Sequence, residues 1–115
     1  MLPADRIRIQ HMRDAAAKAI AATQGRTRDD LVKDDVWALG LVKCMEIIGE
    51  AAARIGRNTQ KQYPHIPWIE ISTMRNRLVH VYFDIDLDQV WKGITEDLPA
   101  LVSKLEKILA EDPAE

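Results

Sequence analysis

The chain has 115 residues, 47% hydrophobic and 30% charged, which fits one compact domain over residues 1–115 without room for a deep private cleft. Helix-forming residues dominate and aromatic residues make up only 5%, so the composition predicts an all-α fold. The formal net charge of -2 excludes the broadly basic surface of a general nucleic-acid binder, so any nucleic-acid contact must be local. The single cysteine, Cys44, excludes a disulfide within the chain, and no apolar run resembles a secretory signal or a membrane span. We therefore expect a cytoplasmic protein.

The first predicted element is an amphipathic helix that Asp5 caps and that runs to Gly25. Its apolar side recurs at three- and four-residue steps, at Ile9, Met12, Ala16, Ala19, Ile20 and Thr23. Thr27 and Asp30 then form a cap-like pair, which predicts a short helical turn through Val32.

A long second helix is predicted to start at a cap formed by Asp34 or Asp35 and to stop at Gly56. Its expected core face is Leu39, Val42, Met45 or Glu46, Ile48, Ala52 and Ile55. Glu46 and Glu50 lie one turn apart on this helix. Three interpretations of this pair are open: a paired-carboxylate site, a surface-lining face, or a salt bridge to an arginine.

A connection with a helical turn near residues 59–62 leads to Pro67, which suits the first turn of a third helix that continues to about Tyr82. Asp86 and Gln89 form a capping box for a fourth helix, and Pro99 should kink or restart that helix near residue 97. A final amphipathic stripe follows at Leu101, Leu105, Ile108 and Leu109. The sequence thus predicts an up-down bundle of four to five helices.

The third predicted helix carries Arg75, Asn76, His80 and Tyr82, a density of hydrogen-bonding side chains that a packed core does not require. At about 100° per residue, Asn76 and His80 share one face, whereas Arg75 and His80 are roughly 140° out of phase. Arg75 and His80 meet only if the helix unwinds near His80, if Arg75 reaches round, or if a second copy completes the site. This geometry favours a homodimer.

These groups suit metal-free RNA cleavage. An imidazole can exchange protons with the ribose 2′-OH and the leaving 5′-oxygen, and a guanidinium can hold the phosphate oxygens in the transition state. Asn76 can orient either partner. The structural alternative makes Arg75 part of a solvated face, His80 a helix-end histidine, and Tyr82 a packing residue.

The remaining candidates are better explained by structure. Trp37, Trp68 and Trp91 each lie on a helical stripe and are expected to be core or interface anchors. His11 and His65 are expected on the surface. The histidines show no metal-ligand spacing and no carboxylate or cysteine cluster adjoins His80, so we expect no metal and no cofactor.

The sequence resembles the HEPN superfamily, and within it the HepT-like toxins, whose ribonuclease members carry Arg, four to six residues, and then His. Five segments carry the resemblance: Arg75-Asn76-Arg77-Leu78-Val79-His80, the His80-Val81-Tyr82 extension, Ile47-Ile48-Gly49-Glu50-Ala51-Ala52, Pro67-Trp68, and residues 86–99 with Asp97-Leu98-Pro99. The resemblance itself extends over nearly the whole chain.

This resemblance implies a homodimeric, metal-independent endoribonuclease that serves as the toxin of a toxin–antitoxin pair, with transfer RNA as the expected substrate. It assigns catalysis to Arg75, Asn76 and His80. The family's antitoxin, the minimal nucleotidyltransferase MntA, silences the toxin by transferring AMP from ATP to the tyrosine of the extension, here Tyr82. Two alternatives stay open. One is a non-catalytic helical subunit that presents a nucleotide or polymer to a nucleotidyltransferase, and the other is a structural interaction bundle.

Overall fold

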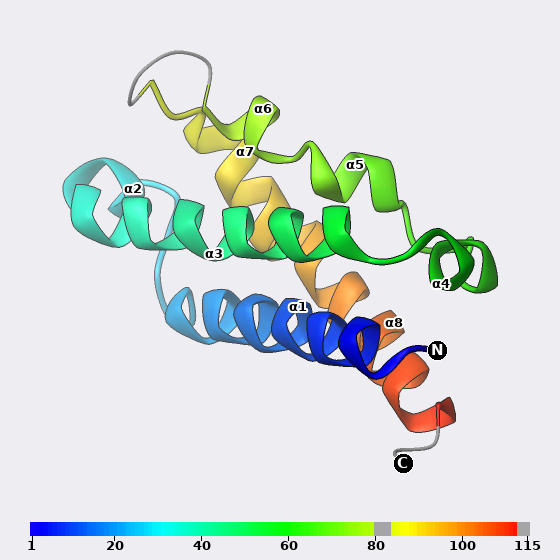
Figure 1. Cartoon of the computed structure of the whole chain (residues 1–115). Helices are drawn as coiled ribbons and strands as arrows, with labels where there is room; N and C mark the ends of the chain where they lie inside the picture. The colour runs from blue at the N-terminus through cyan, green and yellow to red at the C-terminus, as the bar shows by residue number, and fades with distance from the viewer. Residues whose placement is uncertain (80–83, 113–115) are drawn as a thin grey trace.

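The structure, a computed structural model, describes residues 1–79 and 84–112. Over these residues the regular structure is helical, apart from an isolated bridge between Val79 and Ile85. The three long helices are α1 (Pro3–Ala22), α3 (Asp35–Arg54) and α8 (Leu98–Glu111), and α1 packs against both of the others (Figure 1). The prediction of an all-α helical bundle is confirmed.

The start of α1 differs from the prediction, because Pro3 already stands in the first helical turn, where its missing N–H costs nothing. Asp5 is therefore inside the helix, and the expectation that it caps the helix is wrong. Its side chain is only 3% exposed and accepts hydrogen bonds from the Gly56 amide at 3.2 Å and the Thr59 hydroxyl at 2.7 Å. Gly25, with φ of 73°, follows the helix as predicted.

The short helix α2 (Asp30–Lys33) leads into α3, whose cap is Asp34 as predicted. The Asp34 carboxylate accepts the Trp37 amide hydrogen at 3.0 Å and pairs with Arg26 at 3.1 Å. Both interactions lower the pKa of Asp34, and the hydrogen bond from the Trp37 amide has the larger effect. Leu39 is 45% exposed, so its assignment to the core is wrong. Apolar residues occupy several adjacent positions here, and packing on α1 turns Ala38 and Leu41 inward instead.

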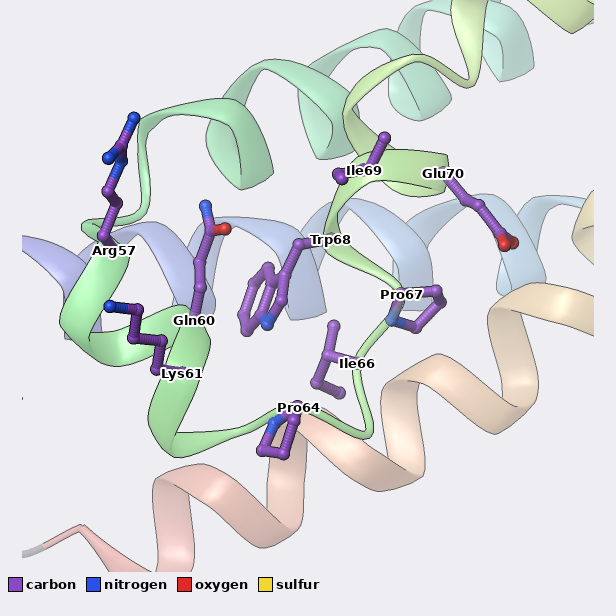
Figure 2. A pocket seen from close by; sticks show the side chains of 9 residues that line it. All are labelled: Arg57, Gln60, Lys61, Pro64, Ile66, Pro67, Trp68, Ile69 and Glu70. Carbon is purple, nitrogen blue, oxygen red and sulfur yellow. The ribbon is translucent and has the colours of Figure 1, made fainter.

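Two short helices follow, α4 (Arg57–Gln62) and α5 (Trp68–Ser72). The predicted turn near residues 59–62 is thus part of α4. Trp68 begins α5 directly after Pro67, and its indole N–H donates to the Tyr63 carbonyl at 3.0 Å. Figure 2 shows the Trp68 ring between Gln60 and Ile66, at the back of a hollow that α4 and α5 flank.

The predicted continuous helix from residue 68 to Tyr82 is wrong. The chain leaves helical geometry after Ser72, resumes it in α6 (Arg75–Leu78), and is extended at Val79, with φ of −129° and ψ of 111°. A continuing helix would offer the Leu78 carbonyl to the amide of residue 82. That carbonyl instead accepts the Asp86 amide hydrogen at 2.7 Å, so a contact with a residue farther along the chain ends the helix.

The C-terminal part agrees with the capping and proline signals. Asp86 accepts the Gln89 amide hydrogen at 3.1 Å at the start of α7 (Leu87–Lys92). A π-helical turn, η1 (Gly93–Asp97), then leads into α8, which carries Pro99 in its first turn. The helix is therefore restarted where the proline predicted it.

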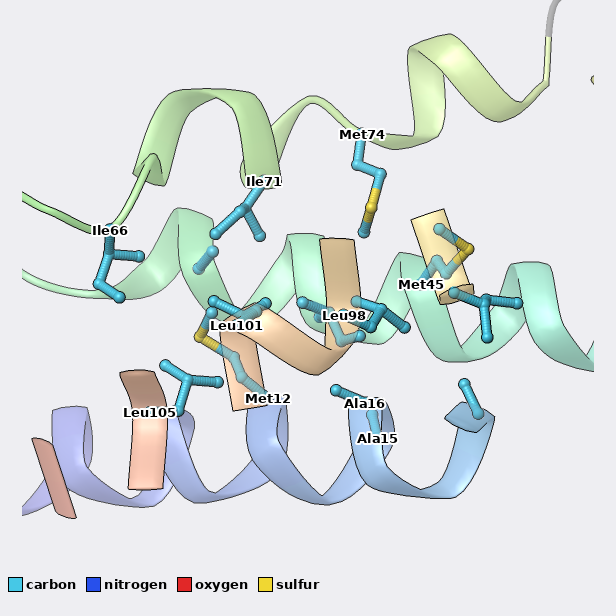
Figure 3. Close-up of a cluster of buried hydrophobic side chains, with 14 of the residues drawn as sticks. Met12, Ala15, Ala16, Met45, Ile66, Ile71, Met74, Leu98, Leu101 and Leu105 are labelled. Carbon is cyan, nitrogen blue, oxygen red and sulfur yellow. The ribbon is translucent and has the colours of Figure 1, made fainter. Parts of the chain in front are cut away.

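The core joins all of these segments. Figure 3 shows buried side chains of α1, α3, α5 and α8 gathered in one cluster, with Met74 from the link between α5 and α6. Ile9, Met45, Ile48 and Leu105 are at most 1% exposed. The segment that carries the candidate site is thus packed directly on the bundle.

Candidate functional site

The candidate site begins with a close contact between α3 and the end of α5. A Cβ atom on Gly49 would lie 3.0 Å from the Ile71 carbonyl oxygen and 3.6 Å from that of Ser72. Only glycine allows the two backbones to come this close without displacement. The position of α5, and of the segment that follows it, therefore depends on Gly49.

Arg75 is the first residue of α6, and its Nε donates to Glu46 Oε1 of α3 at 2.9 Å. The arginine side chain is 60% exposed, whereas that of Glu46 is 22% exposed. Within the described part of the chain, the two Nη nitrogens of Arg75 have no hydrogen-bond partner. The carboxylate thus holds the guanidinium from one side and leaves its fork open to a ligand. Of the alternatives for Glu46, the salt bridge to an arginine is the one found.

Asn76 and Arg77 follow on the same short helix and are both exposed. The Arg77 guanidinium donates to the Glu70 carbonyl at 3.1 Å, which ties α6 back to α5. Asn76 and Arg75 therefore lie on one exposed turn, although the structure gives the Asn76 amide group no partner among the described residues.

His80 and Tyr82 lie outside the described residues. The residue before His80, Val79, is already extended and bridged to Ile85. The 140° phase difference assumed a regular helix, and that assumption fails at Val79. The helix thus unwinds at Val79, and the phase difference by itself no longer favours a dimer.

The other candidates occupy structural positions. Trp68 is buried, and Trp37 donates its indole N–H to the Ala22 carbonyl at 3.2 Å and stacks under Arg26, so their assignment as anchors is confirmed. Trp91 packs half-buried against the core. His11 and His65 are exposed as expected, and the carboxylate that pairs with Arg75 is that of Glu46 and not that of Glu50.

Two further findings bear on the class of protein. Among the described residues, no group of three or more His, Cys, Asp or Glu side chains is placed to hold a metal ion. None of the helices in the described ranges combines the length and apolarity needed to cross a bilayer.

Comparison with known proteins identifies the family. Residues 12–108 match the model of a family described as "Ribonuclease HepT-like". A protein of Thermococcus cleftensis named "Probable ribonuclease HepT" is 36% identical over 96 residues, which cover 80% of this chain and 87% of that protein.

Two other relatives carry the name "Putative RNase". The one from Caldanaerobacter subterraneus is 30% identical over 104 residues, or 90% of this chain and 93% of the relative. The one from Methanocaldococcus jannaschii is 32% identical over 89 residues, or 77% of this chain and 74% of the relative. No solved structure matches the chain. With the family model matching most of its length, this chain belongs to the HepT-like ribonuclease family.

Proposed function

We propose that the chain is the toxin of a toxin–antitoxin pair and cuts RNA, with transfer RNA as the expected target, without a metal ion. His80 removes the proton from a ribose 2′-OH, whose oxygen then attacks the adjacent phosphorus. The bond to the 5′-oxygen breaks, and that oxygen takes up a proton from the protonated imidazole. The upstream fragment then ends in a 2′,3′-cyclic phosphate.

The observation that supports this proposal best is the state of Arg75. Its guanidinium is exposed, is held through Nε by Glu46, and keeps its Nη nitrogens open. A bidentate fork of this kind fits two non-bridging phosphate oxygens, and its charge opposes the charge that grows on them during the reaction. Asn76 on the same turn can orient the phosphate or the imidazole.

A homodimer is part of the proposal, and α3 offers a surface for it. Val36, Leu39 and Ile47 are 76%, 45% and 37% exposed, and at about 100° per residue they lie on one face of the helix, together with the exposed Lys43. Glu46 lies at the edge of this face and holds Arg75. A second copy packed on the face would bring its own Arg75 close to the first.

The dimer is tested by the variant Ile47→Lys, which replaces an apolar side chain of this face with a second lysine beside Lys43. We expect a monomer in light scattering after gel filtration, where the unchanged protein is a dimer. Lys18→Ala, on the exposed side of α1, is the control and should stay dimeric. A dimeric Ile47→Lys protein would contradict the assignment of this face.

The cleavage proposal is tested with purified protein, RNA and an excess of chelator, followed by mapping of both new ends. Cleavage that leaves a 2′,3′-cyclic phosphate upstream and a 5′-hydroxyl downstream supports it. An absolute requirement for magnesium would contradict the metal-free route. RNA binding without any cleavage would favour the non-catalytic subunit.

Regulation through Tyr82 is a separate part of the proposal. An AMP group on the phenol, two residues from His80 in sequence, adds negative charge and bulk where the RNA phosphate must bind. The test incubates the protein with ATP and the partner nucleotidyltransferase, measures the mass of the Tyr82 peptide, and assays cleavage. Tyr82→Phe is the control and should stay active. An unmodified Tyr82 would contradict regulation by AMP transfer but would not affect the proposal that the protein cuts RNA.

A further inference from the structure

Two hollows flank α5 and adjoin one another. The first, of about 440 Å³, lies between α4 and α5 (Figure 2), and the second, of about 520 Å³, is lined by residues of α5–α6 and of the segment from α7 to α8. Pro67 and Glu70 line both hollows, so the hollows share a wall. The second also includes Arg77, two residues after Arg75. A continuous surface therefore leads from α4 along α5 to Arg77 on α6, the short helix that also carries Arg75.

Cations gather along this surface. Arg57 and Lys61, one turn apart on α4, line the first hollow, and Arg77, Lys92 and Lys104 line the second. Three carboxylates lie among them, on Glu70, Glu96 and Asp97, so the surface is net positive in a chain whose net charge is -2.

These cations are also available. The side chains of Arg57, Lys61, Lys92 and Lys104 make no hydrogen bond or ion pair within the described residues, and Arg77 donates only to a backbone carbonyl. Most other described arginines are neutralised: Arg6 pairs with Asp112 and Arg28 with Asp88. A polyanion can therefore bind along α5 without first displacing a carboxylate.

The walls of both hollows are partly apolar. Ile69 is 78% exposed at the first hollow, whereas Ile71, Met74 and Leu101, which line the second, are each only 7% exposed. Grooves for single strands combine cations that follow the phosphates with side chains against which the bases lie, and the first hollow offers Arg57 and Lys61 for the phosphates and Ile69 for a base. Figure 2 shows Arg57 and Lys61 on α4 and Ile69 on α5, on opposite sides of the first hollow.

We propose that these two hollows are a binding track for the single-stranded stretch of RNA that flanks the cleaved phosphodiester. Arg77, on the same short helix as Arg75, holds one phosphate, and Arg57 and Lys61 hold phosphates farther along the strand. This inference rests on the proposed function and names the surface that holds the substrate strand beside α6.

The test is the double variant Arg57→Ala, Lys61→Ala, assayed on a long single-stranded RNA and on a trinucleotide that spans only the site. Loss of two phosphate contacts should raise KM for the long RNA by about tenfold and leave kcat unchanged. It should also reduce the slope of log K against log salt concentration by about 1.4, at roughly 0.7 per phosphate for a single strand. The trinucleotide should be cleaved as before.

The matched control is Lys18→Ala, Arg54→Ala, which removes the same two charges from exposed positions outside both hollows. It should leave KM and the salt slope unchanged. Circular dichroism and thermal melting of both double variants establish that the helices are intact.

An unchanged KM and salt slope for the long RNA would overturn the track. An equal loss on the trinucleotide would overturn it too, because the effect would then come from the site itself. Weakened binding of a protein partner with unchanged RNA binding would assign the surface to that partner instead. If the wild-type protein cuts no RNA, the proposed function fails, whereas the salt slope of RNA binding still decides the track.

Discussion

Two carboxylates on the long helices, Asp5 and Glu46, bind groups from distant parts of the chain in opposite ways. Asp5 on α1 is 3% exposed and accepts from the Gly56 amide and the Thr59 hydroxyl, with Arg8 at 3.4 Å. Glu46 on α3 is 22% exposed and binds one nitrogen of an arginine that is itself 60% exposed. The Asp5 carboxylate is thus buried with its partners, whereas the Glu46–Arg75 pair is accessible to solvent and to a ligand.

The two carboxylates contribute to different properties of the protein, Asp5 to its stability and Glu46 to its function. A buried carboxylate whose partners would be left without an acceptor contributes to the free energy of unfolding. An exposed ion pair contributes little to that free energy, but it can hold a cation in place for a ligand. We therefore expect changes at Asp5 to alter folding and changes at Glu46 and Arg75 to alter activity.

The largest effect on stability is expected from Asp5→Ala. It leaves the Gly56 amide and the Thr59 hydroxyl without their acceptor, which should lower the free energy of unfolding by about 2–3 kcal/mol. Urea unfolding measures the loss, and the cleavage rate well below the melting temperature should be unchanged. Asp14→Ala, at an exposed carboxylate of the same helix, is the control and should unfold like the wild type. A stable Asp5→Ala protein would show that the buried contacts contribute nothing.

Gly49→Ala should affect both stability and activity. The added methyl group meets the Ile71 carbonyl at 3.0 Å, so α5 must move away from α3, at a cost of about 1–2 kcal/mol. Because α6 follows α5, cleavage should fall as well. Gly40→Ala on the same helix meets nothing within 4 Å and should raise stability by up to about 1 kcal/mol. Equal stability of the two variants would contradict the role given to the close contact.

A smaller effect on stability is expected from Glu46→Gln. Removing the charge that holds Arg75 should lower kcat about fivefold through lost orientation, while the free energy of unfolding changes by less than about 0.5 kcal/mol. Glu50→Gln, one turn farther along α3, is the matched control and should keep full kcat. If both variants behave alike, Glu46 does not position Arg75.

The smallest expected effect is on the free energy of unfolding at low pH. The Trp37 amide hydrogen bond and then Arg26 lower the pKa of Asp34 below 3.8 in the folded protein. A lowered pKa stabilises the fold above pH 3.8, and this contribution is lost as the pH falls through the folded pKa. Urea unfolding from about pH 5 downward should therefore show a shallower acid loss for Asp34→Asn than for the wild type. If stability falls equally steeply with pH in both proteins, folding does not lower the pKa of Asp34.

The elements that could be predicted from sequence are those set by local signals. Periodicity and caps predicted the long helices, the Asp34 cap, the Asp86–Gln89 cap and the restart at Pro99, because each depends on residues within a turn of one another.

The errors have nonlocal causes. Asp5 finds its partners more than fifty residues away, at Gly56 and Thr59, and the helix through residue 78 ends because its carbonyl accepts from Asp86. Leu39 faces solvent because packing on α1, rather than the apolar pattern, decides the rotation of α3.

The candidate site divides in the same way. Residue type and spacing are enough to select Arg75 and Asn76, and the sequence also offers Glu46 as a possible arginine partner. Which arginine it binds could not be predicted, because the pair is separated by 29 residues and depends on the close approach at Gly49.

The most direct test measures cleavage and stability together for Arg75→Ala. With the transition-state cation removed, the rate of RNA cleavage in chelator should fall by about 100-fold or more. The free energy of unfolding should stay within about 0.5 kcal/mol of the wild type, because the lost ion pair is exposed. Arg13→Ala, which also removes an exposed ion pair, should keep both quantities. An Arg75→Ala protein that cuts RNA at the wild-type rate would contradict the assignment of Arg75 to the chemistry.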